Sequence, residues 1–168
     1  MKRILIIDTS ILCVWLDVPG LNACGPNDDR WDRARVEKKI QHEMEQDTTF
    51  VLPLATILET GNHIAQAQQS RRERGKALAE LMKQSADRQT PWAAFSDQSA
   101  LWSAEKVKAL ADIWPDLAAQ KLSLGDATIK DVAEYYAQIG YAVEILTGDK
   151  GLKAHQPATP LQVPRRRL

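Results

Sequence analysis

The sequence predicts an α/β domain built around a mostly parallel sheet, and two features predict this class. Three short apolar segments of strand length, residues 2–7, 49–54 and 142–146, alternate with longer segments of helical periodicity. The chain has 168 residues, of which 44% are hydrophobic, so it is long enough for one domain with a sizeable core. Strands that alternate with helices favour a parallel sheet.

An apolar strand and helix open the chain, and a surface excursion follows them. Residues 2–7 contain four consecutive apolar side chains and predict a buried strand, while residues 10–16 predict the start of a helix. Residues of about 17–35 are rich in Pro, Gly, Asn and Asp, which is typical of a surface excursion. Residues 33–46 then predict an amphipathic helix, because apolar residues recur at every fourth position: Val36, Ile40 and Met44.

The middle of the chain predicts a strand followed by a helical insertion. Residues 49–54 read as the strand, and a helix is expected from Ala55. A basic segment, 69–84, predicts the next helix, and a further helix over 103–114 is expected to end at Pro115. The helical insertion spans about 70–118.

The last third of the chain gives the clearest pattern. Residues 126–138 predict a helix that ends before Gly140, and residues 142–146 predict a strand followed by Thr147-Gly148-Asp149. The apolar stripe of the helix consists of Ile129, Val132, Ala133 and Tyr136.

Four acidic residues occupy comparable positions near strand ends and helix starts. Asp8 ends the first strand and Asp149 follows the last one. Glu59 lies one turn into the helix after residues 49–54, and Asp126 opens the helix of residues 126–138. Ligands of parallel α/β sheets gather outside the carboxyl ends of the strands, so these acids are expected to converge.

Each acid also has a structural explanation. Asp126 fits a helix cap or first-turn acid, Asp149 fits a turn residue, and Glu59 fits a solvated helix position. Asp8 is the hardest to explain structurally, because a charge at the end of a buried strand is costly unless it is paired or bound to metal.

The order IIDTS, LPLATILET, LGDATIKDVA and ILTGDKGL resembles PIN-domain ribonucleases, a family that includes many toxins of toxin–antitoxin systems. The resemblance implies one PIN-like nuclease domain over residues 1–168, folded as a three-layer α/β/α sandwich with a mostly parallel central sheet. It implies endonucleolytic cuts that leave a 3′-hydroxyl and a 5′-phosphate. The chain departs from compact toxins by extra length before Glu59 and between Glu59 and Asp126. The implied catalytic and metal-binding quartet is Asp8, Glu59, Asp126 and Asp149, with Ser10 and Thr147 at the accompanying hydroxyl positions.

Converging carboxylates repel one another unless a cation lies between them. Oxygen donors favour Mg²⁺ or Mn²⁺ over Zn²⁺, and either ion suits phosphodiester hydrolysis. We expect Asp8 and Asp126 to be the principal ligands, with Glu59 and Asp149 holding a second ion or orienting water; the number of ions stays open. The accessory residues expected beside them are Ser10, Thr147 and Asn62.

The expected partners are an RNA substrate and an antitoxin or another protein that restrains the enzyme, with a homodimer left open. The net charge is zero, so contacts to RNA must come from local clusters. A solvated helix face is the alternative reading of the main cluster, and a solubilising end that of the C-terminal arginines. The substrate-binding candidates are Arg71, Arg72, Arg74 and Lys150, followed by Arg165, Arg166 and Arg167.

Other classes of protein are less consistent with the sequence. The chain has two cysteines, no visible secretory signal and no stretch of membrane-spanning length, so we expect a cytoplasmic protein without a membrane partner. A non-catalytic PIN-like scaffold that binds RNA or protein is the main alternative. A phosphatase of the haloacid-dehalogenase type is a further one, but the second acid of such enzymes is replaced here by Ser10.

Overall fold

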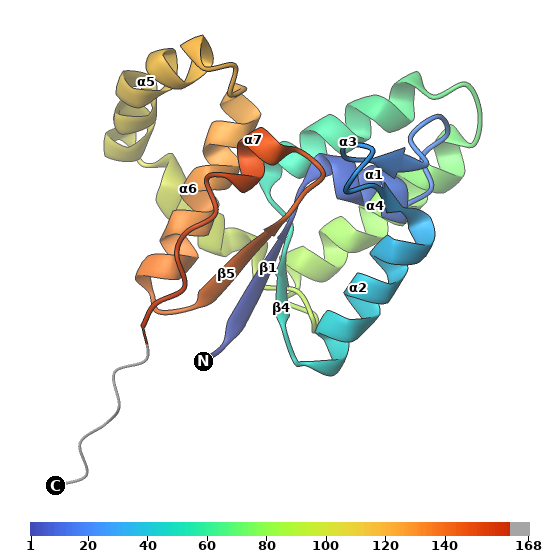
Figure 1. Cartoon of the computed structure of the whole chain (residues 1–168), viewed down its shortest axis with the longest axis horizontal. Helices are drawn as coiled ribbons and strands as arrows, with labels where there is room; N and C mark the ends of the chain where they lie inside the picture. Colours follow the sequence, from blue (N-terminus) through green and yellow to red (C-terminus); the bar gives the residue numbers. More distant parts are fainter. Residues whose placement is uncertain (162–168) are drawn as a thin grey trace, which may run out of the picture.

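The computed structural model describes residues 1–161 and contains a parallel sheet of three strands with helices on both sides (Figure 1). β1 (Arg3–Ile7) lies in the middle, between β4 (Thr49–Val51) and β5 (Ala142–Leu146), and it pairs with both in parallel register. The predicted α/β class with a parallel central sheet is therefore confirmed. All three strands end at the same edge of the sheet, which gathers the segments that follow them.

Helices make up most of the remaining chain. None of the helices within residues 1–161 combines the length and the apolarity that crossing a bilayer requires. The helices are α1 (Thr9–Trp15), α2 (Arg33–Glu45), α3 (Leu54–Gln66), α4 (Arg71–Ala86), the 3₁₀ helix η1 (Phe95–Trp102), α5 (Ala104–Ala119), α6 (Leu124–Gln138) and α7 (Lys150–Lys153).

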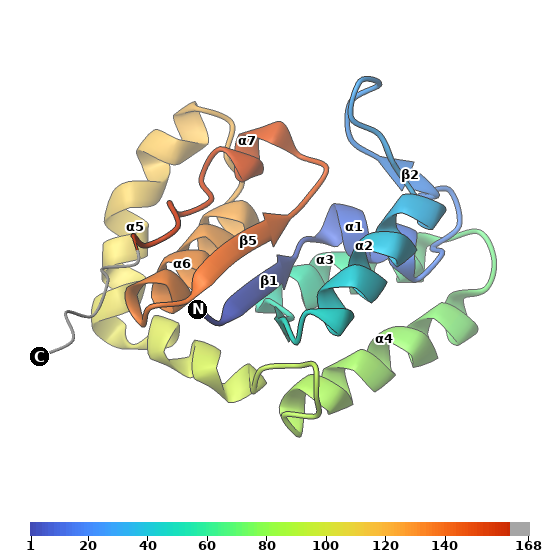
Figure 2. The same ribbon diagram turned by 60° about the horizontal axis from the view of Figure 1, so that its bottom comes forward.

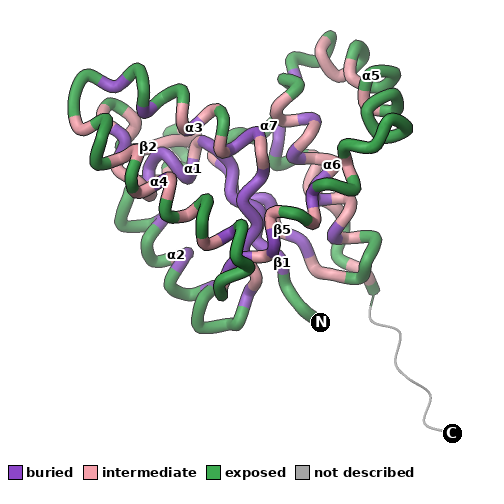
Figure 3. Tube along the Cα trace, turned by 180° about the vertical axis from the view of Figure 1, so that it is seen from behind, coloured by how far each residue is buried: buried purple, intermediate pink, exposed green. Residues whose placement is uncertain are grey.

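The sheet separates two hydrophobic cores. Side chains alternate between the faces of a strand, so Leu5 and Ile7 pack into the core that includes residues of α1 and α2. Ile4 and Ile6 pack into the other core, which is formed largely with α6. Burial on both faces explains why this strand is continuously apolar. Figure 3 shows the strands as the most buried part of the fold, with exposed segments around them.

Both outer edges of the sheet are occupied. The backbone of Phe50 in β4 bonds to residues 91–93 through two hydrogen bonds of 2.7 and 2.8 Å. On β5, the Ile145 amide donates to the Gln156 side chain at 3.0 Å, and the Ile145 carbonyl accepts from Lys153 Nζ at 2.8 Å. Other segments of the chain thus satisfy backbone groups on both edge strands.

The inward face of α2 differs from the predicted one. Val36 and Ile40 are buried as expected, but Met44 is 44% exposed. Glu43 is buried instead, at 1% exposure, because it forms ion pairs and hydrogen bonds that compensate its desolvation. Its partners are Arg3 Nη2 at 2.7 Å, Lys39 Nζ at 2.9 Å and Thr48 Oγ1.

The expectation that a helix ends at Pro115 is wrong, because α5 continues to Ala119. Proline removes one hydrogen bond, to the carbonyl of Ala111, and Ala111 is exposed, so water reaches that carbonyl. No residue of α5 is buried, and the helix lies at the periphery against α6 and η1 (Figures 1 and 2).

Candidate active site

The four predicted acids line one cavity at the edge where the parallel strands end. The cavity has a volume of about 350 Å³. The acids come from four separate segments: the end of β1, the middle of α3, the first turn of α6 and the turn after β5. The four are Asp8, Glu59, Asp126 and Asp149.

Asp8 is 5% exposed, and two hydroxyl groups satisfy its carboxylate. Its Oδ2 accepts hydrogen bonds from Ser10 Oγ at 2.8 Å and from Thr147 Oγ1 at 2.7 Å. The same hydroxyls accept from the Gly148 amide at 3.1 Å and from the Asp149 amide at 2.9 Å. This network fixes the orientation of Asp8 and joins the loops that follow β1 and β5. The hydroxyl residues named from the sequence therefore both contact Asp8.

Glu59 lies on α3 and is held by a residue that the sequence did not single out. Thr9 Oγ1 donates to Glu59 Oε2 at 2.9 Å. The other oxygen, Oε1, lies so close to Gly125 that a Cβ atom at this position would overlap it. The absence of a side chain at Gly125 thus allows the Glu59 carboxylate to approach the first turn of α6.

The Asp126 carboxyl interacts electrostatically with the other three acids. Its amide donates to Ser123 Oγ at 3.0 Å, which begins α6. Burial raises the pKa of the Asp126 carboxyl to about 6, and the negative charges of Asp8, Asp149 and Glu59 add to this increase. The carboxyl groups therefore share one electrostatic environment.

Asp149 has a structural role at the same time. Its Oδ1 accepts from the amides of Gly151 at 2.8 Å and Leu152 at 3.4 Å, so the residue caps the short helix α7. The cap accounts for one carboxylate oxygen. Asp149 therefore has a structural role in the turn after β5, as the sequence allowed, and it also lines the cavity.

The predicted surface excursion forms another wall of the cavity. It contains a short antiparallel pair, β2 (Ala23–Cys24) and β3 (Trp31–Asp32), and Cys24 lines the cavity. A Cβ atom at Gly148 would lie 2.8 Å from Cys24 Sγ, so the close approach of the excursion requires glycine there. Cys13 lines the same cavity; burial raises its pKa to about 11 and also raises that of Cys24. Both thiols therefore stay protonated near neutral pH.

The accessory residue predicted on α3 lies away from the cavity. Asn62 is exposed and does not line it, whereas His63, one position further along α3, does. The helical period alone did not distinguish these two neighbours of Glu59.

The basic candidates are also outside the cavity lining. Arg71 and Arg72 are exposed at the start of α4, and Arg74 forms a 3.4 Å ion pair with Asp17. Lys150 Nζ lies 3.7 Å from Oδ1 of Asp28 in the excursion, with which it forms an ion pair. The residues Arg165, Arg166 and Arg167 lie outside the described part of the chain.

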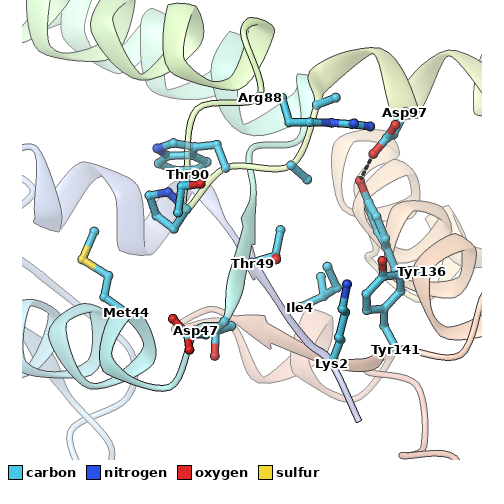
Figure 4. A pocket seen from close by; sticks show the side chains of 15 residues that line it. Lys2, Ile4, Met44, Asp47, Thr49, Arg88, Thr90, Asp97, Tyr136 and Tyr141 are labelled. Carbon is cyan, nitrogen blue, oxygen red and sulfur yellow. Dashed lines mark hydrogen bonds between the residues drawn. The ribbon is translucent and has the colours of Figure 1, made fainter.

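A larger cavity is at a different place. It has a volume of about 690 Å³, and Figure 4 shows its lining, which includes Lys2 and Tyr141. The hydroxyl of Tyr136 donates to Asp97 there, at 3.2 Å. None of the four acids lines this cavity, so size alone does not identify the candidate active site.

The acids of the cavity could hold a metal ion only together with other ligands. Within residues 1–161, no three His, Cys, Asp or Glu side chains are arranged so that they could hold an ion by themselves. Magnesium, however, takes one or two carboxylates and completes its octahedral shell with water and phosphate. Four acids around one cavity, with a raised pKa at Asp126, fit a hard cation bound in that way. A cation would also relieve the repulsion that raises this pKa.

Comparison of the chain with protein-family models, with curated proteins and with solved structures found no match.

Proposed function

We propose that the chain is a PIN-like endoribonuclease that depends on Mg²⁺ or Mn²⁺ and hydrolyses RNA phosphodiester bonds. One observation carries the proposal: four carboxylates from distant segments line a single cavity at the carboxyl edge of a parallel sheet. The raised pKa of Asp126 supports it further, because perturbed acids in a cavity are typical of functional sites. The sequence resemblance to PIN-domain ribonucleases, with their three-layer sandwich, points in the same direction.

The chain's own residues have distinct roles in this mechanism. When bound, the metal supplies Lewis acidity at the phosphate and a nucleophilic water at neutral pH. Asp8 and Asp126 hold the metal, while Glu59 and Asp149 bind further water or a second ion. Ser10 and Thr147 hold the Asp8 carboxylate in one orientation through bonds of 2.8 and 2.7 Å. Thr9 does the same for Glu59 at 2.9 Å.

The alternatives differ in what the acids do. In a scaffold, the four acids would contribute nothing to catalysis. In a phosphatase of the haloacid-dehalogenase type, Asp8 would attack a phosphate monoester with the help of a second acid two positions later. Here that position is Ser10, whose hydroxyl donates to Asp8 and supplies no carboxylate. This contact favours a role for Ser10 in orienting Asp8.

The test is cleavage of labelled single-stranded RNA by the purified chain in Mn²⁺, in Mg²⁺ and in EDTA. We expect cleavage in either metal, none in EDTA, and at least a hundredfold loss in Asp8→Asn, because several kcal/mol of transition-state stabilisation depend on the metal. The matched control is Asp112→Asn, at an exposed acid of α5, which should cut at the wild-type rate.

Two results would contradict the proposal. RNA binding without cleavage in any metal would identify a scaffold. Hydrolysis of a phosphate monoester, but not of RNA, would identify a phosphatase. The restraining partner inferred from the resemblance stays a prediction. Co-expression with small proteins that are encoded beside this chain, followed by a cleavage assay, would test it.

A further inference from the structure

A second, apolar cavity lies beside the acid cavity and shares one wall with it. Its volume is about 190 Å³. Glu59 lines both cavities, and Gly125 packs against Glu59 from the apolar side. One oxygen of the Glu59 carboxylate accepts from Thr9, which lines the acid cavity, and the other lies against Gly125, which lines the apolar cavity.

Three elements expose large apolar side chains at this cavity. Leu58 of α3 is 58% exposed, Leu124 of α6 is 46% exposed, and Trp102 at the end of η1 is 45% exposed. Large apolar groups gathered at one place on a surface typically mark a site that another molecule covers. Trp102 is the one aromatic ring among the residues that line it.

We propose that this apolar cavity binds one unpaired nucleobase of the RNA, stacked on Trp102 and held between Leu58 and Leu124. The inference rests on the proposed nuclease function. A nucleotide presents a charged phosphate at one end and a flat, largely apolar base at the other. The acid cavity with its metal suits the phosphate, and the adjoining apolar cavity suits the base of a nucleotide next to the cut. Aromatic side chains bind single-stranded nucleic acid by such stacking.

The size and surroundings of the cavity favour a base over a protein segment. A docked helix needs a row of anchor pockets at helical spacing, whereas this cavity is one small compartment. A cation close in sequence to this region is Lys121, which is exposed and forms no ion pair within residues 1–161. It lies two residues before Ser123, which lines the acid cavity. Positive charge beside an apolar platform is the usual combination in single-strand binding.

The proposal predicts a preference for single strands. A base inside a duplex must leave its stack before it can reach Trp102, and this unstacking costs free energy. The enzyme should therefore cut unpaired RNA at least tenfold faster than the same sequence in a duplex. The choice of base should be tolerant, because every base has a face on which to stack.

The test uses a short RNA with 2-aminopurine next to the cut position, whose fluorescence falls on stacking. Binding is measured with Asp8→Asn protein in Mn²⁺, so the RNA stays intact, and cleavage is measured with wild-type Asp8. Trp102→Ala should remove the quenching, weaken binding about five- to hundredfold and raise KM. Trp102→Phe should retain most of the binding.

Leu58→Asp, at an exposed position of α3, should weaken binding without affecting folding. The control is Ile113→Ala on α5, an apolar residue that is 55% exposed and does not line the cavity.

The outcomes separate this proposal from the proposed function. Unchanged quenching and unchanged KM in Trp102→Ala and Leu58→Asp would overturn the base site, while wild-type cleavage would still support the nuclease. Quenching that depends on Trp102, in a protein that cuts no RNA, would support the base site and contradict the nuclease. A change of oligomeric state in Trp102→Ala, with normal RNA binding, would assign the surface to a second copy of the chain and overturn the proposal.

Discussion

Individual residues around the cavity show how a charged site is kept within a folded chain. Asp8 is nearly inaccessible, and its hydrogen bonds to Ser10 and Thr147 replace the water that it loses. Glu59 and Asp126 are only partly buried, and they depend on Gly125 and Ser123 for their positions. The acids are therefore held from different sides, by hydroxyl groups in one case and by the absence of a side chain in another.

Gly125→Ala should disturb the site without unfolding the protein. The new Cβ would overlap Glu59 Oε1, and a flexible side chain moves more readily than the backbone of α6. We expect at least a tenfold loss of RNA cleavage and no loss of thermal stability, because alanine is the better helix former by about 1 kcal/mol. Gly61→Ala on α3 is the control, since its Cβ would meet Leu78 at an ordinary 3.8 Å. Full activity of Gly125→Ala would show that the position of Glu59 is not important.

Asp126→Asn should stabilise the metal-free protein at neutral pH. The carboxyl has a pKa of about 6 when folded and 3.8 as its ordinary value, so its charge destabilises the fold as the pH rises from about 4 to 6. The group is partly exposed, so we discount the effect to about 1 kcal/mol, or about 2–4 °C in Tm. Thermal denaturation in EDTA at pH 7.5 should show this gain.

The same substitution should give no gain at pH 4, where the wild-type carboxyl is already protonated. Asp112→Asn, at the exposed acid of α5, serves as the control at both pH values. An equal change in Tm at pH 4 and pH 7.5 would contradict the assignment of the effect to the charge of Asp126.

At the scale of single elements, hydrophobic patterns predicted the positions of a strand and the buried face of a helix. Residues 142–146 form β5 as predicted, and all four stripe residues of α6 are buried. The strand expected over 49–54 ends at Val51, because Pro53 already caps α3. The pattern failed at Glu43, where polar partners decide burial. One of these partners, Lys39, lies one turn away on α2, but the other cation, Arg3, comes from β1, which the pattern of α2 does not indicate.

Glu43→Gln should destabilise the protein markedly. Burial alone would raise the pKa of Glu43, but hydrogen bonds from Thr48 and Lys39 and the charges of Lys39 and Arg3 lower it overall. Glutamine removes the carboxylate from both ion pairs. We expect a loss of about 1–3 kcal/mol, reduced because Arg3 is partly exposed and because both cations keep Glu144 as a partner, at 3.7 Å from Arg3 Nη2 and 2.9 Å from Lys39 Nζ. Urea denaturation at pH 7 measures the change.

Glu45→Gln is the matched control on the same helix, because Glu45 is exposed. The lowered pKa also sets the pH dependence. The stabilisation is present above the ordinary pKa of a glutamate and is lost as the pH falls through the folded pKa. The wild type and Glu43→Gln should therefore approach each other in stability in acid.

Whether two acids converge is a property of the strand order, and sequence can indicate it only for parallel strands. Asp8 and Asp149 were predictable as neighbours because β1 and β5 end at the same edge. Thr9 and Cys24 were not, since no pattern in their own segments indicates that they face Glu59 or Gly148. The choice between Asn62 and His63 likewise depends on the exact rotation of α3.

On the scale of the whole molecule, the acid cavity and the cavity of about 690 Å³ are lined by different residues, and none of the four acids lines the latter. Metal should therefore act on stability through one site. We expect Mn²⁺ at about a hundred times its Kd to stabilise the wild type by about 2.7 kcal/mol, which raises Tm by about 5–10 °C. Thermal denaturation with Mn²⁺ and with EDTA tests this. An equal shift in Asp8→Asn would place the metal elsewhere.

The two occupied edges of the sheet restrict how copies of this chain can meet. Another chain that adds a strand to the sheet must first displace residues 91–93 from Phe50, or the Gln156 and Lys153 side chains from Ile145. Strand exchange and fibre growth through backbone pairing are thereby disfavoured. Association of two copies is therefore favoured through helix surfaces rather than through pairing of strands at these edges.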